Sequence, residues 1–151
     1  MTDSAGTRLL ASNLRRIVAA WGPALVWMLV IFVFSSIPDV PGQRGLPRAS
    51  NRVLDDTLRQ VAHVVEYAIL AGLLWRAARR SAARCPCLWA AVGSLVYAAS
   101  DEFHQSFVPG RKAHLQDWLT DLVGVALGLA VTFAWHRLHR EPRCHAAVGR
   151  R

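Results

Sequence analysis

The chain has 151 residues, the size of one domain, and 53% of them are hydrophobic, with a mean hydropathy of +0.23. That share exceeds what the core of a small soluble domain requires, so the composition favours a membrane protein. The formal net charge is +8, from 18 Lys and Arg against 10 Asp and Glu, which fits nucleic acid binding or the cytoplasmic flanks of membrane helices. No basic and aromatic stripe accompanies the charge, so we expect no nucleic acid partner.

The cysteines point to neither a disulfide scaffold nor a standard metal site. Their number is odd, and Cys85, Cys87 and Cys144 show no Cys-x-x-Cys spacing. An alternative metal set in the basic tail comprises His136, His139, Cys144 and His145. Because that tail is polar and strongly basic, we do not assign a metal to it.

The first apolar stretch runs from Ile17 to Phe34 without a charged residue. As a helix it reaches about 27 Å, close to a bilayer core of about 30 Å, so we predict a transmembrane helix after an N-terminal arm over 1–16. A signal peptide is the alternative, since Arg15 and Arg16 precede the stretch. The stretch is longer than the apolar region of such peptides, however, and no Ala-x-Ala site follows it.

Three more apolar stretches follow, over residues 61–75, 85–100 and 118–135. His63 and Glu66 interrupt the first of these near its start, and Asp121 interrupts the last. The first two are short for spanning alone, so we expect their helices to extend into polar flanks or to lean on partner helices. The predicted fold is all-α: a bundle of about four transmembrane helices over 17–135, followed by a basic tail over 136–151.

The basic residues orient these four spans. Three arginines precede the first span, four lie between residues 76 and 84, and five follow Trp135, all on the side that holds both termini. The opposite side carries fewer basic residues, which nearby acids offset. Because basic loops stay in the cytoplasm, we predict that both termini are cytoplasmic.

In this topology the polar residues of all four spans fall at the outer boundary of the membrane. They are Ser35 and Ser36, His63 and Glu66, Asp101 to Gln105, and Asp117 and Asp121. Ionisable groups beside membrane-grade hydrophobicity cost free energy unless something pairs or uses them. We therefore predict a single polar site at that boundary, with residues 37–51 as an extended loop that covers it from outside.

Two sets of these residues repeat the helical spacing i, i+3, i+4: His63, Glu66 and Tyr67, and then Asp101, His104 and Gln105. The second set requires the third helix to continue past Ser100. Each set can act on one ligand, or its members can serve as polar contacts between helices. Glu102 is then expected to point elsewhere, towards Arg111 or a headgroup amine.

Asp117 and Asp121 stand one helical turn apart, and Gly124 and Gly128 continue their stripe. Glycines at this spacing let another helix approach closely, which would press both acids against that neighbour. Asp121 requires a counter-charge, a metal ion or a proton, because its burial alone would cost about 2.5–3.5 kcal/mol at mid-bilayer. Arg111 is the predicted cation, either for these acids or for a substrate phosphate.

The sequence does not identify a cofactor. Histidines with several carboxylates match zinc, manganese or calcium better than soft metals, so a divalent metal is one option, although no metal-binding signature is present. Serine-nucleophile, phosphate-loop and nucleotide-binding motifs are also absent from the sequence.

Taken in order, four segments of the chain resemble the VanZ family of bacterial membrane proteins. They are Phe34-Ser-Ser-Ile-Pro38, His63-x-x-Glu-Tyr-Ala-x-Leu70, Asp101-Glu-Phe-His-Gln-x-Phe-Val-Pro-Gly-Arg111 and Asp117-x-x-x-Asp-x-x-Gly-x-x-x-Gly128. The resemblance covers about residues 20–135 and implies a small, helical, multi-pass protein of the bacterial cell membrane. The family often places Asp-Lys just before the histidine, where this chain has Arg59-Gln60. Its founding member is linked to low-level resistance to the glycopeptide teicoplanin.

We predict that an outward-facing polar pocket binds the polar head of a membrane lipid, a lipid-linked molecule or a cell-wall precursor. The candidate ligand-binding residues are Ser35, Ser36, Tyr67, Glu102, Gln105, Arg111, Asp117 and Asp121. A hydrolase or transferase acting on a lipid phosphate or ester, with or without a metal, is the first alternative, with Arg111 holding the anion. Its candidate catalytic residues are His63, Glu66, Asp101 and His104, of which Glu66 or His104 is the general base. A non-catalytic structural or ion-conducting protein is the second alternative.

Overall fold

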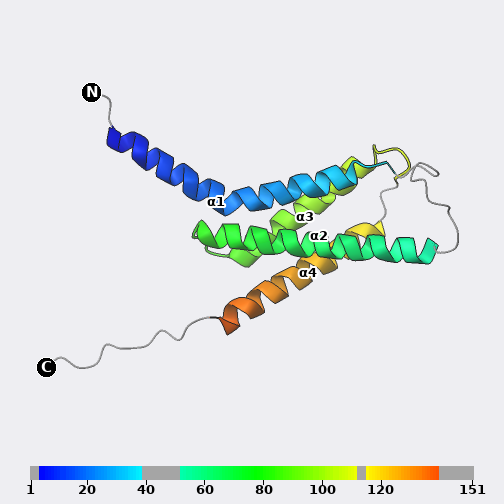
Figure 1. Ribbon diagram of the computed structural model, residues 1–151. Coiled ribbons are helices and arrows are strands. Elements are labelled where there is room, and N and C mark those ends of the chain that lie inside the picture. The colour runs from blue at the N-terminus through cyan, green and yellow to red at the C-terminus, as the bar shows by residue number, and fades with distance from the viewer. Residues whose placement is uncertain (1–3, 39–51, 112–114, 140–151) are drawn as a thin grey trace.

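The computed structural model describes residues 4–38, 52–111 and 115–139. Its helices are α1 (Ser4–Ser35), α2 (Arg52–Arg80), α3 (Pro86–Gln105) and α4 (Leu115–Leu138). They lie lengthwise beside one another in an elongated bundle (Figure 1). One end of the bundle, the basic end, holds the start of α1 and α3 and the last turn of α2 and α4. The other, the polar end, holds the end of α1 and α3 and the start of α2 and α4. The predicted all-α bundle is confirmed.

In the described part of the chain, three helices are long and apolar enough to cross a membrane: Gly6–Ser35, Thr57–Arg80 and Asp117–Leu138. Within the described residues α3 does not reach that standard, because polar residues occupy its last turns from Ser100 to Gln105. It contacts all three other helices, as expected of a short apolar segment that leans on partners. Large apolar side chains, including Leu29, Val96 and Val131, are exposed on the outside of the bundle, which suits contact with lipid.

Helix α2 is the centre of the bundle. It contacts α1, α3 and α4, whereas α1 and α4 make no contact with each other in the described part of the chain. Its buried face carries Tyr67, Leu70, Ala71 and Leu74, and Ala90 and Ala98 of α3 pack in the same core. Because many core residues are alanine, the helices pack at short range.

The α2 and α4 backbones touch along a glycine seam, which we define as Gly124 and Gly128 of α4 against Val64 and Ala68 of α2. A Cβ added at Gly124 would lie 2.5 Å from the carbonyl oxygen of Val64, and one at Gly128 would lie 2.7 Å from Cα of Ala68. Real side chains do not tolerate such approaches, so only glycine allows this packing. The predicted close approach of a neighbouring helix is confirmed, and the neighbour is α2, running parallel to α4.

Short turns set the relative direction of α2 and α3. Helix α2 ends where Ala82 takes the left-handed conformation, with φ 55°, and the Ala83 amide donates to the carbonyl of Ala78 at 3.0 Å. This is the hydrogen-bond pattern of a Schellman cap. Pro86 then opens α3 at its first position, where a missing N–H costs nothing. The two helices therefore run antiparallel.

Pro23 bends α1 near its middle (Figure 1). A proline has no N–H to donate to the carbonyl four residues earlier, which here belongs to Ala19. That freed carbonyl accepts hydrogen bonds from Arg76 at 3.3 Å and from Arg80 at 3.4 Å, both on α2. The residues expected to form an N-terminal arm continue α1 back to Ser4.

The glycine seam gives a direct stability test. Gly128→Ala forces α4 away from α2 and should lower the free energy of unfolding by about 1–3 kcal/mol through overpacking. The matched control is Gly22→Ala, where the new Cβ meets only Val18 Cγ1 at an ordinary 3.8 Å. Thermal unfolding of the detergent-solubilised variants, followed by circular dichroism, compares the two. Equal stability of both variants would contradict the close α2–α4 contact.

Candidate functional site

The end of α1 and the end of α3 share a buried hydrogen-bond network. The Ser35 hydroxyl donates to Asp101 Oδ2 at 2.8 Å, and the Gln105 amide donates to the same oxygen at 2.8 Å. Gln105 also lies 3.3 Å from Ser35 Oγ. All three side chains are buried. The contact depends on α3 continuing to Gln105, which the structure confirms.

A second contact between these helices joins Ser36 to His104. Ser36 Oγ lies 3.0 Å from His104 Nε2 and donates its single proton to the carbonyl of Phe32 at 2.7 Å. When the hydroxyl donates to Phe32, it can only accept from the imidazole, and the proton then lies on Nε2. In this arrangement His104 does not activate Ser36 as a nucleophile, because a general base must accept the hydroxyl proton.

Two acids on α4 pair with two cationic or basic groups on α2. Arg59 forms an ion pair with Asp117, and His63 Nδ1 lies 2.9 Å from Asp121 Oδ1. His63, Asp117 and Asp121 are buried. We expected Arg111 to be the cation for these acids, but the glycine seam places α4 against α2, so Arg59 and His63 take that role. Arg59 was not among the predicted ligand-binding or catalytic residues, although it is the cationic residue nearest to the position where the VanZ family often has Asp-Lys and this chain has Arg59-Gln60.

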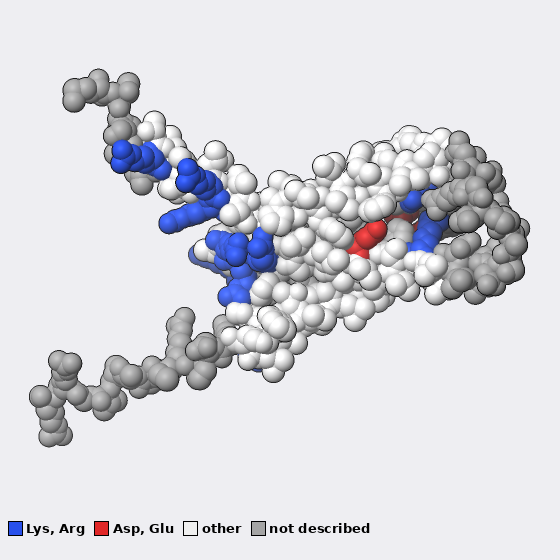
Figure 2. Space-filling view, in the orientation of Figure 1, with Lys and Arg blue, Asp and Glu red and all other residues white. Residues whose placement is uncertain are grey.

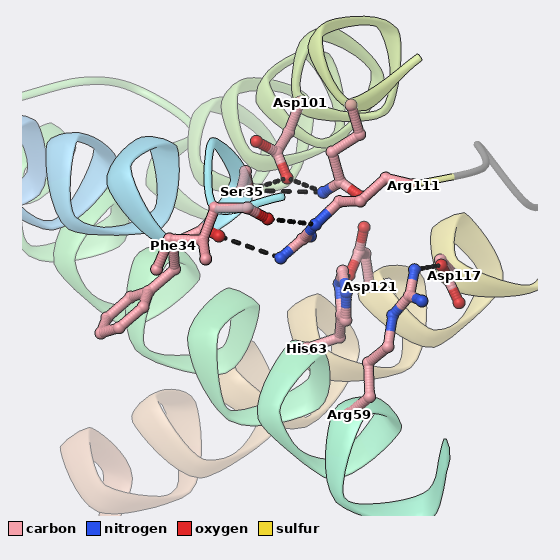
Figure 3. Close-up of polar contacts among 10 residues, drawn as sticks. Phe34, Ser35, Arg59, His63, Asp101, Arg111, Asp117 and Asp121 are labelled. Carbon is pink, nitrogen blue, oxygen red and sulfur yellow. Dashed lines mark hydrogen bonds and ion pairs between the residues drawn. The ribbon is translucent and has the colours of Figure 1, made fainter. Parts of the chain in front are cut away.

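Arg111 ties the loop after α3 to the end of α1. Its side chain donates to the carbonyl oxygen of Phe34, in the last turn of α1, at 2.9 Å, and to that of Ile37, just beyond the helix, at 3.2 Å. The last carbonyls of a helix lack partners within the helix. Gly110, with φ 80°, makes the turn that brings the arginine back. Figure 3 shows the guanidinium beside Asp101 of α3 and Asp121 of α4. Arg111 thus stands where the two networks meet.

The remaining candidates face the same region. Glu66 of α2 is half-buried and interacts electrostatically with His63, Asp101, Asp121 and Arg111. Glu102, predicted to point towards Arg111 or a headgroup amine, is half-buried and lies within electrostatic range of Asp117, Asp121 and His63. Tyr67 is fully buried, one residue beyond Glu66.

Several buried oxygens at this site have no hydrogen-bond partner within the described residues. They are Asp101 Oδ1, Glu102 Oε1, Gln105 Oε1 and the Tyr67 hydroxyl. A buried polar atom without a partner costs about 1–3 kcal/mol, so such atoms usually meet water or a ligand. Three of the four are pure acceptors, and the fourth can also accept. The site therefore offers a ligand mainly hydrogen-bond acceptors.

The predicted site residues of all four helices gather at the polar end. Figure 2 shows acidic atoms in a depression on the side of the bundle near this end, with basic atoms beside them. Among the described residues, no group of three or more His, Cys, Asp or Glu side chains is arranged to hold a metal ion. Cys144 and His145 of the alternative tail set lie outside the described residues, as does the predicted covering loop from residue 39 to residue 51.

Comparison with protein families agrees with the four segments from the sequence. A family model described as VanZ/LLP1 matches residues 20–136, most of the chain and all of the site. The chain belongs to the VanZ/LLP1 family. Searches of curated proteins and of solved structures give no match. For this VanZ protein, the chemistry of the site therefore rests on its own geometry.

The His63–Asp121 pair should behave as one unit in this VanZ protein. His63→Leu or Asp121→Leu alone leaves a buried polar partner without its contact and should destabilise the protein by about 3–5 kcal/mol. The double variant removes both and should be clearly more stable than the sum of the single effects predicts. Denaturant unfolding of all four proteins in detergent measures the coupling. Strictly additive losses would show that the two side chains do not interact.

Proposed function

We propose that this VanZ protein binds the polar head of a membrane-anchored envelope molecule at its polar end. The observation that carries the proposal is the set of unpartnered buried oxygens of Tyr67, Asp101, Glu102 and Gln105, next to two acids already held by α2. A protein that needed these residues only as contacts between helices would pair them with one another. Within the described residues, Asp101 Oδ2 accepts two hydrogen bonds and Asp101 Oδ1 accepts none.

The vacant atoms favour a ligand that donates hydrogen bonds. An ammonium group or a cluster of sugar hydroxyls supplies several donors and matches an acceptor-rich, acidic site. A bare phosphate monoester supplies few donors, and its charge would be repelled by Asp101 and Glu102. We therefore favour the glycan or amine portion of a lipid-linked cell-wall precursor, or an amine-bearing lipid headgroup.

The membrane arrangement supports an outward-facing site. We propose a multi-pass protein of the bacterial cell membrane with both termini in the cytoplasm. In the described part of the chain, eight arginines from Arg8 to Arg137 lie at the basic end, and three, Arg52, Arg59 and Arg111, lie at the polar end. Figure 2 shows basic side chains gathered at the basic end. Basic residues remain on the cytoplasmic side, so the polar end would face the envelope.

Binding is favoured over catalysis at this site. The Ser36 hydroxyl has a backbone acceptor in Phe32, and while it donates there His104 does not take its proton. The described residues form no metal cluster that could activate water. Ion conduction has less support, because the described acids, including Glu66 and Asp121, have no counterparts along the basic halves of the helices. The teicoplanin link of the VanZ family fits a binder that changes how cell-wall precursors are presented at the surface.

The proposal predicts selective binding in detergent. Native mass spectrometry should detect a complex with a lipid-linked disaccharide-peptide precursor or with phosphatidylethanolamine. It should detect little binding of phosphatidylcholine, whose ammonium has no N–H, or of a polyprenyl monophosphate. Asp101→Asn should weaken binding by about tenfold. The amide has no negative charge, and its NH₂ group can place a donor where the ligand needs an acceptor.

The control variant is Ser106→Ala, which lies one residue beyond α3, is exposed and bonds only to the carbonyl of Phe103. It should bind as wild type does. Preferential binding of the monophosphate, or an unchanged affinity in Asp101→Asn, would overturn the proposal. Release of a cleaved product that disappears in both Glu66→Gln and His104→Gln would instead establish the hydrolase alternative.

A further inference from the structure

A second concave site lies at the basic end of the bundle, far from the polar residues. Its volume is about 270 Å³, and it is lined by Trp75, Arg76, Arg79 and Arg80, all in the last turns of α2. Figure 2 shows basic side chains gathered on this end. We name it the arginine pocket. Neither the sequence patterns nor the family resemblance assigned it any role.

The arginine pocket is fixed by contacts to three helices. Arg76 and Arg80 reach the Ala19 carbonyl that Pro23 leaves free on α1. Arg79 lies over the ring of Trp75, with its guanidinium carbon 4.8 Å from the ring centroid, and its Nη1 lies 2.7 Å from His136 Nε2 of α4. These contacts occupy few of the five N–H donors that each guanidinium carries. The side chains are held in place while most of their donors stay available.

Nothing acidic balances the arginine pocket within the described residues. The described residues form two ion pairs, Arg59–Asp117 and His63–Asp121, and both lie at the polar end. Arg76 Nε is buried and has no hydrogen-bond partner in the described part of the chain. Three guanidinium groups around one concavity, with an unmet buried donor, are suited to an anion with several oxygen atoms.

The surroundings indicate that this anion belongs to a lipid. Ile17 and Val18, just before the Ala19 carbonyl that Arg76 and Arg80 contact, are exposed apolar residues of α1. Trp135, next to His136 in α4, is exposed as well. A phosphate in the pocket would therefore have apolar surface beside it for acyl chains, and Trp side chains are enriched at that depth of a membrane.

We propose that the arginine pocket is a binding site for the phosphate headgroup of an anionic phospholipid in the leaflet at the basic end. Basic pockets between membrane helices bind such headgroups by charge-assisted hydrogen bonds. The site is independent of the ligand proposed for the polar end. Loss of either binding activity therefore leaves the other testable.

The experiment compares three probes on the full-length protein in neutral detergent: phosphatidylglycerol, phosphatidylcholine with the same acyl chains, and inorganic phosphate. Native mass spectrometry counts bound lipid, and thermal unfolding reports stabilisation. Phosphatidylglycerol should bind and raise the unfolding temperature, and the other two probes should have little effect. Arg79→Gln should weaken phosphatidylglycerol binding by about tenfold, and the triple variant Arg76→Gln, Arg79→Gln, Arg80→Gln should abolish it.

The control is the triple variant Arg8→Gln, Arg15→Gln, Arg16→Gln, which removes the same charge from the same end but outside the pocket. It should bind phosphatidylglycerol as wild type does. If the pocket triple variant loses its helical circular dichroism, Arg79→Gln alone decides, since Arg79 is exposed and its partner His136 is only half-buried. Equal losses in both triple variants would show general attraction to charge and overturn the proposal. Equal binding of phosphatidylcholine, or saturation by inorganic phosphate alone, would overturn it too.

Discussion

The backbone contact between α2 and α4 is the constraint on which the polar site depends. Gly124 and Gly128 let α4 lie directly on Val64 and Ala68 of α2. Nearer the polar end, the same contact brings His63 to Asp121 about one helical turn away and Arg59 to Asp117 about two turns away. If side chains held the helices apart, these acids would lose their partners at a depth where an unpaired charge is costly.

The pairing of the buried acids is incomplete, and that is what separates a functional interpretation from a purely structural one. Asp117 and Asp121 are held by α2, and one oxygen of Asp101 accepts from both Ser35 and Gln105. Among the described residues, the other oxygen of Asp101 is buried without a hydrogen-bond partner, as are oxygens of Glu102 and Gln105. A site that retains vacant acceptors next to satisfied ones is preorganised for a donor-bearing ligand.

The two ends of the bundle carry opposite chemistry, and each is organised by an interruption of helix geometry. At the polar end, the end of α1 offers carbonyl oxygens that hold Arg111. At the basic end, Pro23 frees the carbonyl of Ala19, which holds Arg76 and Arg80. In both places an arginine satisfies a backbone acceptor that lacks its usual helical donor, and in the arginine pocket this positions guanidinium groups for an outside anion.

The sequence by itself determined the helical class, the approximate spans, the gathering of polar residues at one end and the role of the Gly124–Gly128 stripe. Those features follow from local periodicity, length and composition, which any single helix displays. Only the tertiary structure decided that Arg59 pairs with Asp117, that Glu102 lies within electrostatic range of Asp117 and Asp121, and that α2 carries an arginine pocket. Partner choice depends on which helices are neighbours and on how they are rotated, and residues 58 positions apart in the chain contain no local signal of that arrangement.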